Sequence, residues 1–341
     1  MKQASGSGLI EVLVVLAVLS MLLVAGVLII QMPDKKPVEN QTTEVEAQSE
    51  HNVTDTTNTD DSFKIDYGVS LSPLSFNGSD FTSFFDQAES SGTAITWAGE
   101  SSELNDPTSA PYVLFEQARA RSLLPIIITD HKNKEAIIEF ANKYKPAYLG
   151  IGNEVNLLPL AEQQNLIAAY PGLVGEIKIV SPNTVVFPVF QLERMKGLGG
   201  GLYGGQNTPD QHTWRLLESF PKAKAFGFTT YPGMIYPNPA DIPGDYYSDL
   251  STQTEKPVLF TEVGWQSRSV GTGWESTPDE QATFATSFFE LVEELHPRLV
   301  IWSFLYDQKV DSPFDSMGLI GRDGKEKPAF EAWKEKVGDG I

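Results

Sequence analysis

Short apolar runs alternate with amphipathic stretches along most of the chain, from Phe63 onward. Brief apolar runs bounded by turn residues are typical of buried strands, and the amphipathic stretches between them of crossover helices. The pattern predicts eight such units and therefore a parallel sheet. The predicted strands are IDYGVS from Ile65, TAITWAG from Thr93, LPIIITD from Leu124, AYLGIGNE from Ala147, TVVFPVFQ from Thr184, AFGFTTYP from Ala225, PVLFTEVGW from Pro257 and LVIWSFLYD from Leu299.

Two of the intervening stretches predict helices, Lys134 to Lys145 and Pro278 to His296. The second opens with Thr277 as N-cap, and Glu280 completes a capping box. Eight units over a length near the ~250 residues of a (β/α)8 barrel favour a closed TIM barrel over an open doubly wound sheet. An open sheet usually carries a phosphate-binding loop after its first strand, and SLSPLSFNGS, from Ser70, is not one.

The N-terminal part of the chain has a different pattern. The run from Val12 to Ile30 carries no charge and is long enough to cross a hydrocarbon core of about 30 Å, so we expect a membrane anchor over residues 1–32. The start, MKQASGSGLIEVLVVLAVLS, resembles a type IV prepilin, with Gly6 at the cleavage position and Glu11 at the fifth mature position. A polar, acidic linker, residues 33–62, is expected to be disordered, and the α/β barrel takes up residues 63–341.

Composition narrows the possible functions. The formal charge is −20, with 25 Lys and Arg against 45 Asp and Glu, so most of the surface would repel nucleic acid. The chain has no cysteine, which removes disulfides, thiolate metal sites and a cysteine nucleophile. Its four histidines are scattered without metal-ligand spacing, and no cofactor motif is present, so we expect neither a metal nor an organic cofactor.

Two apolar runs end in a carboxylate. In YLGIGNEVN, from Tyr148, the apolar run ends at Asn153 and Glu154, and in PVLFTEVGW, from Pro257, it ends at Glu262. An unpaired buried charge is costly, so we place both glutamates at the carboxyl ends of strands four and seven, where barrel enzymes assemble their active sites. Two carboxyl groups facing one pocket suit glycoside cleavage, because repulsion raises the proton affinity of one and lets it act as an acid.

An Asn-Glu pair closing strand four, a Glu closing strand seven, an aromatic closing strand six and a Trp on strand eight together resemble the clan A retaining glycoside hydrolases. The motifs TEVGW and GLIGRDGKEKPAFEAW are most similar to the endo-β-galactanase and plant-type endo-β-glucanase families. The resemblance implies that Glu154 is the general acid/base and Glu262 the nucleophile. It also implies that Asn153 bonds the sugar 2-hydroxyl, Tyr231 holds the nucleophile and Trp302 floors the reacting subsite.

The sequence departs from that pattern in one place. Many members carry an arginine near the end of strand two that supports the nucleophile, whereas ITWAGE offers Trp97 and Glu100. Three tryptophans lie at or near strand ends: Trp97, Trp265 and Trp302. Each has a flat apolar face suited to stacking against a sugar ring. Further cleft residues are expected at the remaining strand ends: Asp130, His131, Glu193 and Asp307.

Each assignment has an alternative. A glutamate at a strand end can be a capping or salt-bridging residue, Asn153 a turn residue, Tyr231 a residue that shapes the loop before Pro232, and Trp302 barrel packing. The four remaining strand-end residues serve equally well in stabilising loops. The matched pair of glutamates is the feature that favours catalysis.

The sequence therefore predicts a membrane-anchored, extracytoplasmic hydrolase of β-linked poly- or oligosaccharides that acts with retention. A non-catalytic surface protein that binds glycan is the alternative from another class, and the missing arginine favours it. An envelope transglycosylase with the same site is a further alternative, distinguished by transfer products.

Overall fold

The computed structural model describes residues 65–338. The expected anchor, the linker and the prepilin-like start lie outside the described residues. The strands are β1 (Asp66–Ser70), β2 (Ala94–Gly99), β3 (Leu124–Thr129), β4 (Tyr148–Ile151), β5 (Val185–Phe187), β6 (Val189–Gln191), β7 (Phe226–Thr230), β8 (Val258–Val263), β9 (Leu299–Trp302), β10 (Phe304–Tyr306) and β11 (Gly318–Ile320).

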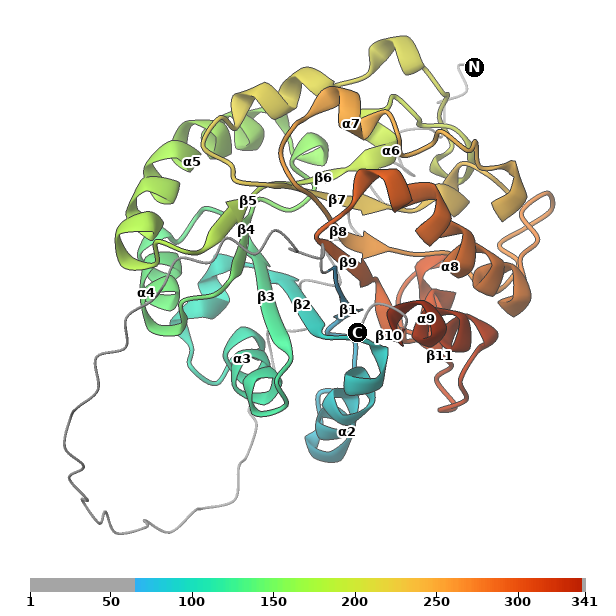
Figure 1. Cartoon of the computed structure of the whole chain (residues 1–341), viewed down its shortest axis with the longest axis horizontal. Helices are drawn as coiled ribbons and strands as arrows, with labels where there is room; N and C mark the ends of the chain where they lie inside the picture. The colour runs from blue at the N-terminus through green and yellow to red at the C-terminus, as the bar shows by residue number, and fades with distance from the viewer. Residues whose placement is uncertain (1–64, 339–341) are drawn as a thin grey trace, which may run out of the picture.

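The first nine strands form one parallel sheet in the order β5-β4-β3-β2-β1-β9-β8-β7-β6 (Figure 1). The two edges are halves of the same barrel strand, because β5 and β6 are separated only by Pro188, which lacks the amide a continuous ladder needs. β5 pairs with β4 and β6 pairs with β7. The sheet is thus an eight-stranded parallel barrel, nearly closed, as the strand pattern predicted. β10 and β11 form a separate small parallel pair.

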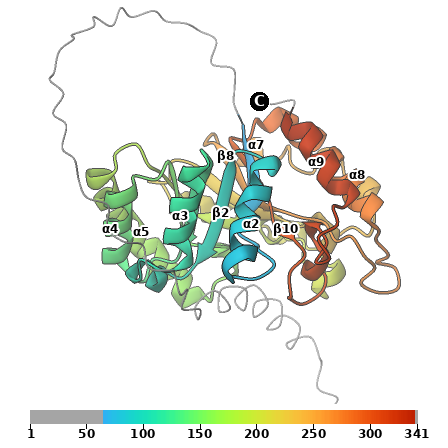
Figure 2. The ribbon, with the colours of Figure 1, turned by 90° about the horizontal axis from the view of Figure 1, so that it is seen from below.

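Helices surround the sheet, and Figure 2 shows α2 and α3 lying outside β2. Thr277 caps α8 by accepting a hydrogen bond from the Glu280 amide at 3.2 Å, as predicted from the sequence. The helices are α2 (Gly78–Ala88), α3 (Ala110–Ala120), α4 (Lys134–Tyr144), α5 (Leu160–Val180), α6 (Leu192–Met195), α7 (Leu250–Gln253), α8 (Pro278–Val292) and α9 (Pro328–Gly338).

Successive residues of each strand face opposite sides, which divides the core into two parts. The barrel interior holds a compact apolar cluster: Ala94, Ile126, Ile128, Phe187, Val189, Ala225, Leu259, Leu299 and Ile301. The alternate positions, such as Ile95, Ile127 and Val300, belong to the larger cluster shared with the helices. This division decides which strand-end side chains can reach a pocket at the barrel axis.

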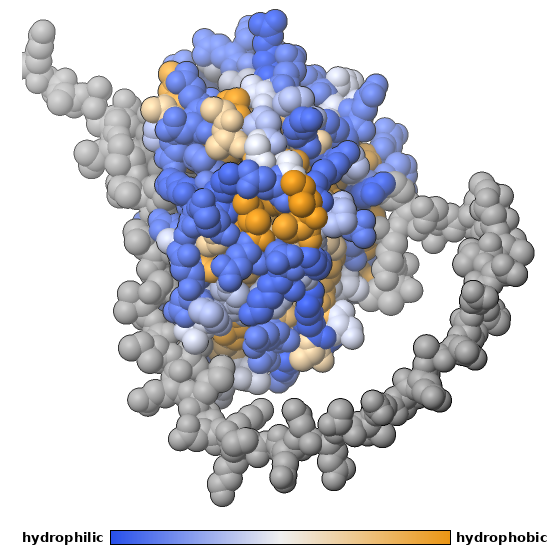
Figure 3. All heavy atoms as spheres, turned by 90° about the vertical axis from the view of Figure 1, so that its left-hand side faces the viewer, coloured by the Kyte–Doolittle hydropathy of each residue, from blue (hydrophilic) through white to orange (hydrophobic). Residues whose placement is uncertain are grey.

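The surface of the domain is mainly polar. Figure 3 shows a mostly hydrophilic face with apolar side chains gathered near its centre and others scattered over it. The exposed large hydrophobic side chains of residues 65–338 are Leu74, Leu160 and Ile179. No helix between residues 65 and 338 is long and apolar enough to span a membrane.

Candidate active site

Glu154 lies just beyond the carboxyl end of β4, in a backbone conformation that non-glycine residues seldom adopt. Its φ and ψ angles are 44° and 51°, in the left-handed region, which costs an L-residue of order 1 kcal/mol or more. The preceding Gly152 is also at positive φ, 92°. Strain of this kind persists only where the surroundings hold it in place, and it directs the Glu154 side chain into the buried end of the barrel.

The environment of Glu154 favours its protonated form. Burial and the negative charge of Glu262 raise the pKa of Glu154 to about 8, with a smaller contribution from Glu193. A hydrogen bond from the Thr229 hydroxyl to Oε1, at 2.6 Å, acts in the opposite direction. At neutral pH this carboxyl group therefore carries a proton that it can give to a bound molecule.

A β-bulge places the Glu262 side chain on the pocket side. Leu259 of β8 faces the barrel interior, so strict alternation would turn Thr261 inward and Glu262 outward. The pairing of β8 shifts register between Phe260 and Val263 against β9, and Thr229 of β7 lies opposite Glu262. Bulges re-aim side chains next to active sites, and this one brings Glu262 to the face that carries Thr229.

The Glu262 carboxylate is partly exposed and is held by Tyr231. The phenol of Tyr231 donates a hydrogen bond to Oε2 of Glu262, the pair of residues that the resemblance implied. Burial raises the pKa of Glu262, and the Tyr231 hydrogen bond lowers it. Burial also raises the pKa of Tyr231 well above its usual range, so the phenol keeps its proton. Tyr231 in turn accepts a hydrogen bond from Ser303 at 3.3 Å.

Asn153 contributes a free acceptor beside these groups. Its Oδ1 atom is buried and has no hydrogen-bond partner within residues 65–338. A buried acceptor without a donor is unfavourable, and Asn153 directly precedes Glu154 in the chain, so its predicted hydrogen bond from a sugar hydroxyl stays a prediction. In the same range, no group of three His, Cys, Asp or Glu side chains is arranged to hold a metal ion.

The three tryptophans expected to line the cleft are packed inside the protein instead. Their exposed fractions are 5% for Trp97 and 0% for Trp265 and Trp302. Trp302 alternates with the inward-facing Ile301 and therefore points to the helix layer, where its indole N–H donates to the Met317 carbonyl at 2.8 Å. Trp97 and Trp265 also belong to the core shared with the helices. The expectation that these three rings stack against a bound sugar is therefore wrong, because none of them has a face exposed to a ligand.

Two of the acidic strand-end residues hold loops together. Asp130 accepts hydrogen bonds from the Ser101 hydroxyl at 2.5 Å and the Lys132 amide at 2.7 Å. Asp307 forms an ion pair with Lys327 at 2.6 Å and accepts from the Gly318 amide at 2.9 Å. Both carboxylates thus hold loops, the alternative that the sequence left open, and their predicted contact with substrate stays a prediction.

His131 is half-buried, and burial lowers its pKa. It follows β3 at the same end of the barrel, so its predicted contact with substrate stays a prediction.

Sequence reasoning missed the hydroxyl groups that organise the site. Thr229 and Ser303 each bond a catalytic candidate or its partner, yet both are small polar residues of a type that strands commonly carry. Glu193 was expected in the cleft, but it is fully buried behind it. The only sequence signal for Thr229 is the polar doublet in TTYP at the end of an apolar run.

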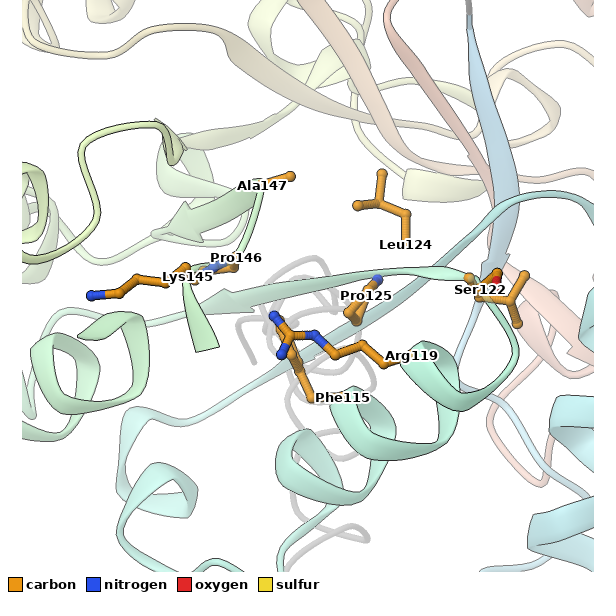
Figure 4. A pocket seen from close by; sticks show the side chains of 9 residues that line it. Phe115, Arg119, Ser122, Leu124, Pro125, Lys145, Pro146 and Ala147 are labelled. Atoms are coloured by element: carbon orange, nitrogen blue, oxygen red, sulfur yellow. The ribbon is translucent and has the colours of Figure 1, made fainter. Parts of the chain in front are cut away.

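A pocket of about 380 Å³ lies at the opposite, amino-terminal end of the barrel strands (Figure 4). Its cations are already used: Arg119 donates to the Tyr144 carbonyl, and Lys145 donates to the Val180 carbonyl. Since barrel chemistry occurs at the other end, this pocket does not belong to the site. Its lining is Phe115, Arg119, Ser122, Leu123, Leu124, Pro125, Lys145, Pro146 and Ala147.

No protein-family model matches the sequence, and no curated protein is significantly similar to it. Solved structures are similar in fold. A family 39 glycoside hydrolase from the gut symbiont Bacteroides cellulosilyticus WH2 superposes with a TM-score of 0.57 at 16% identity, covering 81% of this chain and 64% of that one. The exo-beta-1,4-mannosidase Op5Man5 from Opitutaceae bacterium strain TAV5 gives 0.55 at 15% identity, over 81% and 59%.

The GH5_18 protein from Streptomyces cattleya in complex with Manb1-4GlcNAc gives a TM-score of 0.55 at 13% identity, covering 80% of each chain. The present chain spans about six-tenths of the length of the first two structures, 64% and 59%. At identities this low the similarity shows the fold, a barrel of the kind that these glycoside hydrolases share.

Proposed function

We propose that the barrel domain is a retaining glycoside hydrolase that cleaves β-linked poly- or oligosaccharides. The observation that carries the proposal is the unequal pair of glutamates. Glu154 is buried and holds its proton at neutral pH, whereas Glu262 receives a hydrogen bond that favours its ionised form. Burial raises the pKa of Glu262 as well, but the charge of Glu262 adds to the shift of Glu154, and the Tyr231 hydrogen bond opposes the shift of Glu262. This asymmetry favours the acid role for Glu154 and the nucleophile role for Glu262.

In the proposed first step, Glu262 attacks the anomeric carbon while Glu154 gives its proton to the departing glycosidic oxygen. The C–O bond of the substrate breaks, and an ester bond forms between the sugar and Glu262. In the second step the Glu154 carboxylate takes a proton from water, and the water oxygen displaces Glu262 from the sugar. Retention follows if the two carboxyl groups act about 5 to 5.5 Å apart.

Asn153 and Tyr231 support these steps. The unpartnered Oδ1 of Asn153 would accept a hydrogen bond from a sugar hydroxyl next to the reacting carbon. The Tyr231 phenol stabilises the Glu262 carboxylate before attack and after the ester is hydrolysed. Similarity in fold to glycoside hydrolases agrees with this assignment of roles, although fold alone does not determine chemistry.

The test is an assay of the purified full-length protein against aryl β-glycosides and β-glycans, beside Glu154→Gln and Glu262→Gln. We expect sugar release by the wild type, a loss of ~10³-fold or more in either variant, and a first-formed product with β configuration by NMR. Binding of a glycan without any cleavage would support the glycan-binding alternative. Transfer of the sugar to an added acceptor in preference to water would support the transglycosylase.

We also propose that the protein is held at the membrane with the barrel outside the cytoplasm. This follows from the apolar run at Val12 to Ile30 and from a polymeric substrate that does not enter cells. Recovery of the full-length protein from membranes only with detergent, and its digestion by protease added to intact cells, would support the placement. Release by a high-salt wash alone would contradict it.

A further inference from the structure

Three consecutive residues at the end of β7 bind three different glutamates. Thr229 donates to Oε1 of Glu154 at 2.6 Å, and Tyr231 donates to Glu262. Thr230, between them, donates to Oε1 of Glu193 at 2.8 Å. Since side chains alternate along a strand, Thr229 and Tyr231 face the pocket, and Thr230 faces the opposite side, where Glu193 lies.

Glu193 also holds the backbone of this segment. The same Oε1 atom accepts a hydrogen bond from the Tyr231 amide at 3.2 Å and another from the Tyr246 hydroxyl at 2.9 Å. Thr230 is tied further to the Tyr247 hydroxyl at 3.0 Å. The main chain that carries both Thr229 and Tyr231 is therefore fixed from behind by one fully buried carboxyl group.

A second connection runs from Glu193 to the loop that carries Glu154. Gln191 donates through Nε2 to Oε2 of Glu193 at 2.5 Å. The Gln191 backbone exchanges two hydrogen bonds with the Asn156 side chain, at 2.8 Å and 2.9 Å. Asn156 is two residues after Glu154, so Glu193 joins the loop after β4 to the end of β7.

No cation explains the burial of Glu193. Within residues 65–338, none of Glu154, Glu193 and Glu262 takes part in an ion pair. The titratable neighbours of Glu193 among the described residues are Tyr203, Tyr236, Tyr246, Tyr247 and Glu154. Burying a carboxyl group without a cation is costly unless hydrogen bonds compensate for the lost water. At Glu193 these hydrogen bonds are the ones to the end of β7 and to Gln191.

We infer that Glu193 is a positioning residue that fixes the Thr229–Tyr231 segment, and through it the hydrogen bonds to both catalytic glutamates. It does not touch the substrate. This inference deepens the proposed hydrolase function and rests on it for its catalytic meaning. The hydrogen-bond geometry that it describes exists independently of any activity.

The experiment measures the titration of Glu262 directly, by ¹³C NMR of full-length protein labelled at glutamate Cδ. Glu262→Gln assigns the signal. The variants are Glu193→Gln, Thr230→Val and Tyr246→Phe, with Tyr231→Phe as the positive control. Tyr170→Phe is the matched negative control, because the buried Tyr170 hydroxyl on α5 has no hydrogen-bond partner among the described residues.

We expect the pKa of Glu262 to rise in Tyr231→Phe, because the Tyr231 hydrogen bond lowers it. Thr230→Val and Tyr246→Phe should shift it in the same direction by a smaller amount, with kcat falling about tenfold and KM nearly constant, as for a modest hydrogen-bond loss in the transition state. Glu193→Gln keeps one side-chain oxygen, which can still accept the hydrogen bonds from Thr230, Tyr231 and Tyr246. This variant should therefore shift the pKa of Glu262 least. Tyr170→Phe should leave both quantities unchanged.

A Glu262 titration that stays at the wild-type value in Thr230→Val and Tyr246→Phe would overturn the inference, even if both variants are less stable. Should Glu193→Gln fail to fold, those two milder variants still decide the question. If the wild type cleaves no glycoside, the proposed function fails, while the titration still tests the positioning. If the wild type is active and the titration is unaffected, the positioning fails and the proposed function stands.

Discussion

Asp307 and the three glutamates of the site region all lie at carboxyl ends of strands, and they are stabilised differently. Glu154, Glu262 and Glu193 receive hydrogen bonds from neutral donors only. Asp307, by contrast, forms an ion pair with Lys327, which also donates to the Ser316 carbonyl. Burial raises the pKa of all four groups, but Lys327 opposes the shift at Asp307, whereas at the three glutamates only hydrogen bonds from neutral donors oppose it.

The largest expected effect concerns the acid role of Glu154. Glu154→Ala should lower kcat/KM by ~10³-fold for substrates with poor leaving groups, which need a proton. A dinitrophenyl glycoside, whose leaving group needs none, should still form the glycosyl-enzyme. Added azide should then restore turnover and yield a β-glycosyl azide, detected by NMR.

The matched control is Glu262→Ala, which lacks the proposed nucleophile and should give an α-glycosyl azide or none. If the two variants exchange these products, the roles of the two glutamates are reversed.

The next effect is on stability. The pKa of Glu154 in the folded protein, about 8, is raised above the usual 4.5 of a glutamate. A raised pKa contributes stability that is fully present below the unfolded value and is lost as pH rises through the folded value. We therefore expect the free energy of unfolding to decrease between about pH 4.5 and pH 8, by on the order of 4 kcal/mol from this group.

Urea unfolding of the wild type and of Glu154→Gln at pH 5, 6.5 and 8 measures this decrease. The variant should be the more stable protein at pH 8, since it buries no charge. Glu290→Gln on α8, where the side chain is exposed, serves as the control and should keep the wild-type dependence. Equal pH dependence in all three proteins would show that Glu154 is not desolvated.

The ion-paired group should respond differently. Lys327→Met leaves Asp307 buried without its partner, which should lower the free energy of unfolding by about 3 kcal/mol. Activity per folded molecule should remain, because no hydrogen bond or ion pair within residues 65–338 joins either residue to Glu154 or Glu262. Lys334→Met is the control: its pairs with Glu326 and Glu331 are more exposed and should cost less than about 1 kcal/mol. A large loss of kcat in Lys327→Met would place Asp307 in the active site after all.

The sequence predicted the eight barrel strands and the two glutamates because both depend on local patterns. Apolar runs mark the strands, and a carboxylate at the end of such a run is rare enough to notice. The side of the sheet to which each side chain points was harder to predict from the sequence. Glu262 reaches the pocket through a register shift against β7 and β9, which depends on pairing with other strands and leaves no trace in the alternation along β8.

The role of Glu193 was hidden for the same reason. Its partners come from the end of β7 and from the loop that contains Tyr246, far away in the sequence. The tryptophans were misplaced because an aromatic ring at a strand end suggests a sugar platform, whereas Trp302 follows the inward-facing Ile301 and so turns outward.

The smallest effects separate the two faces of one strand end. Trp302→Phe removes the indole donor to the Met317 carbonyl and part of the contact with Trp333, so the free energy of unfolding should fall by about 1 to 2 kcal/mol. KM should not change, since the ring lies outside the pocket. The neighbouring Ser303→Ala, on the pocket side, should lower kcat about fivefold through Tyr231, at the ~1 kcal/mol of a neutral hydrogen bond. Its hydroxyl also donates to the Val263 carbonyl at 2.9 Å, so the free energy of unfolding should fall by about 1 kcal/mol as well. Thermal unfolding and steady-state kinetics of the two variants test which side chain faces the pocket. A raised KM in Trp302→Phe would show that the Trp302 ring contacts the substrate.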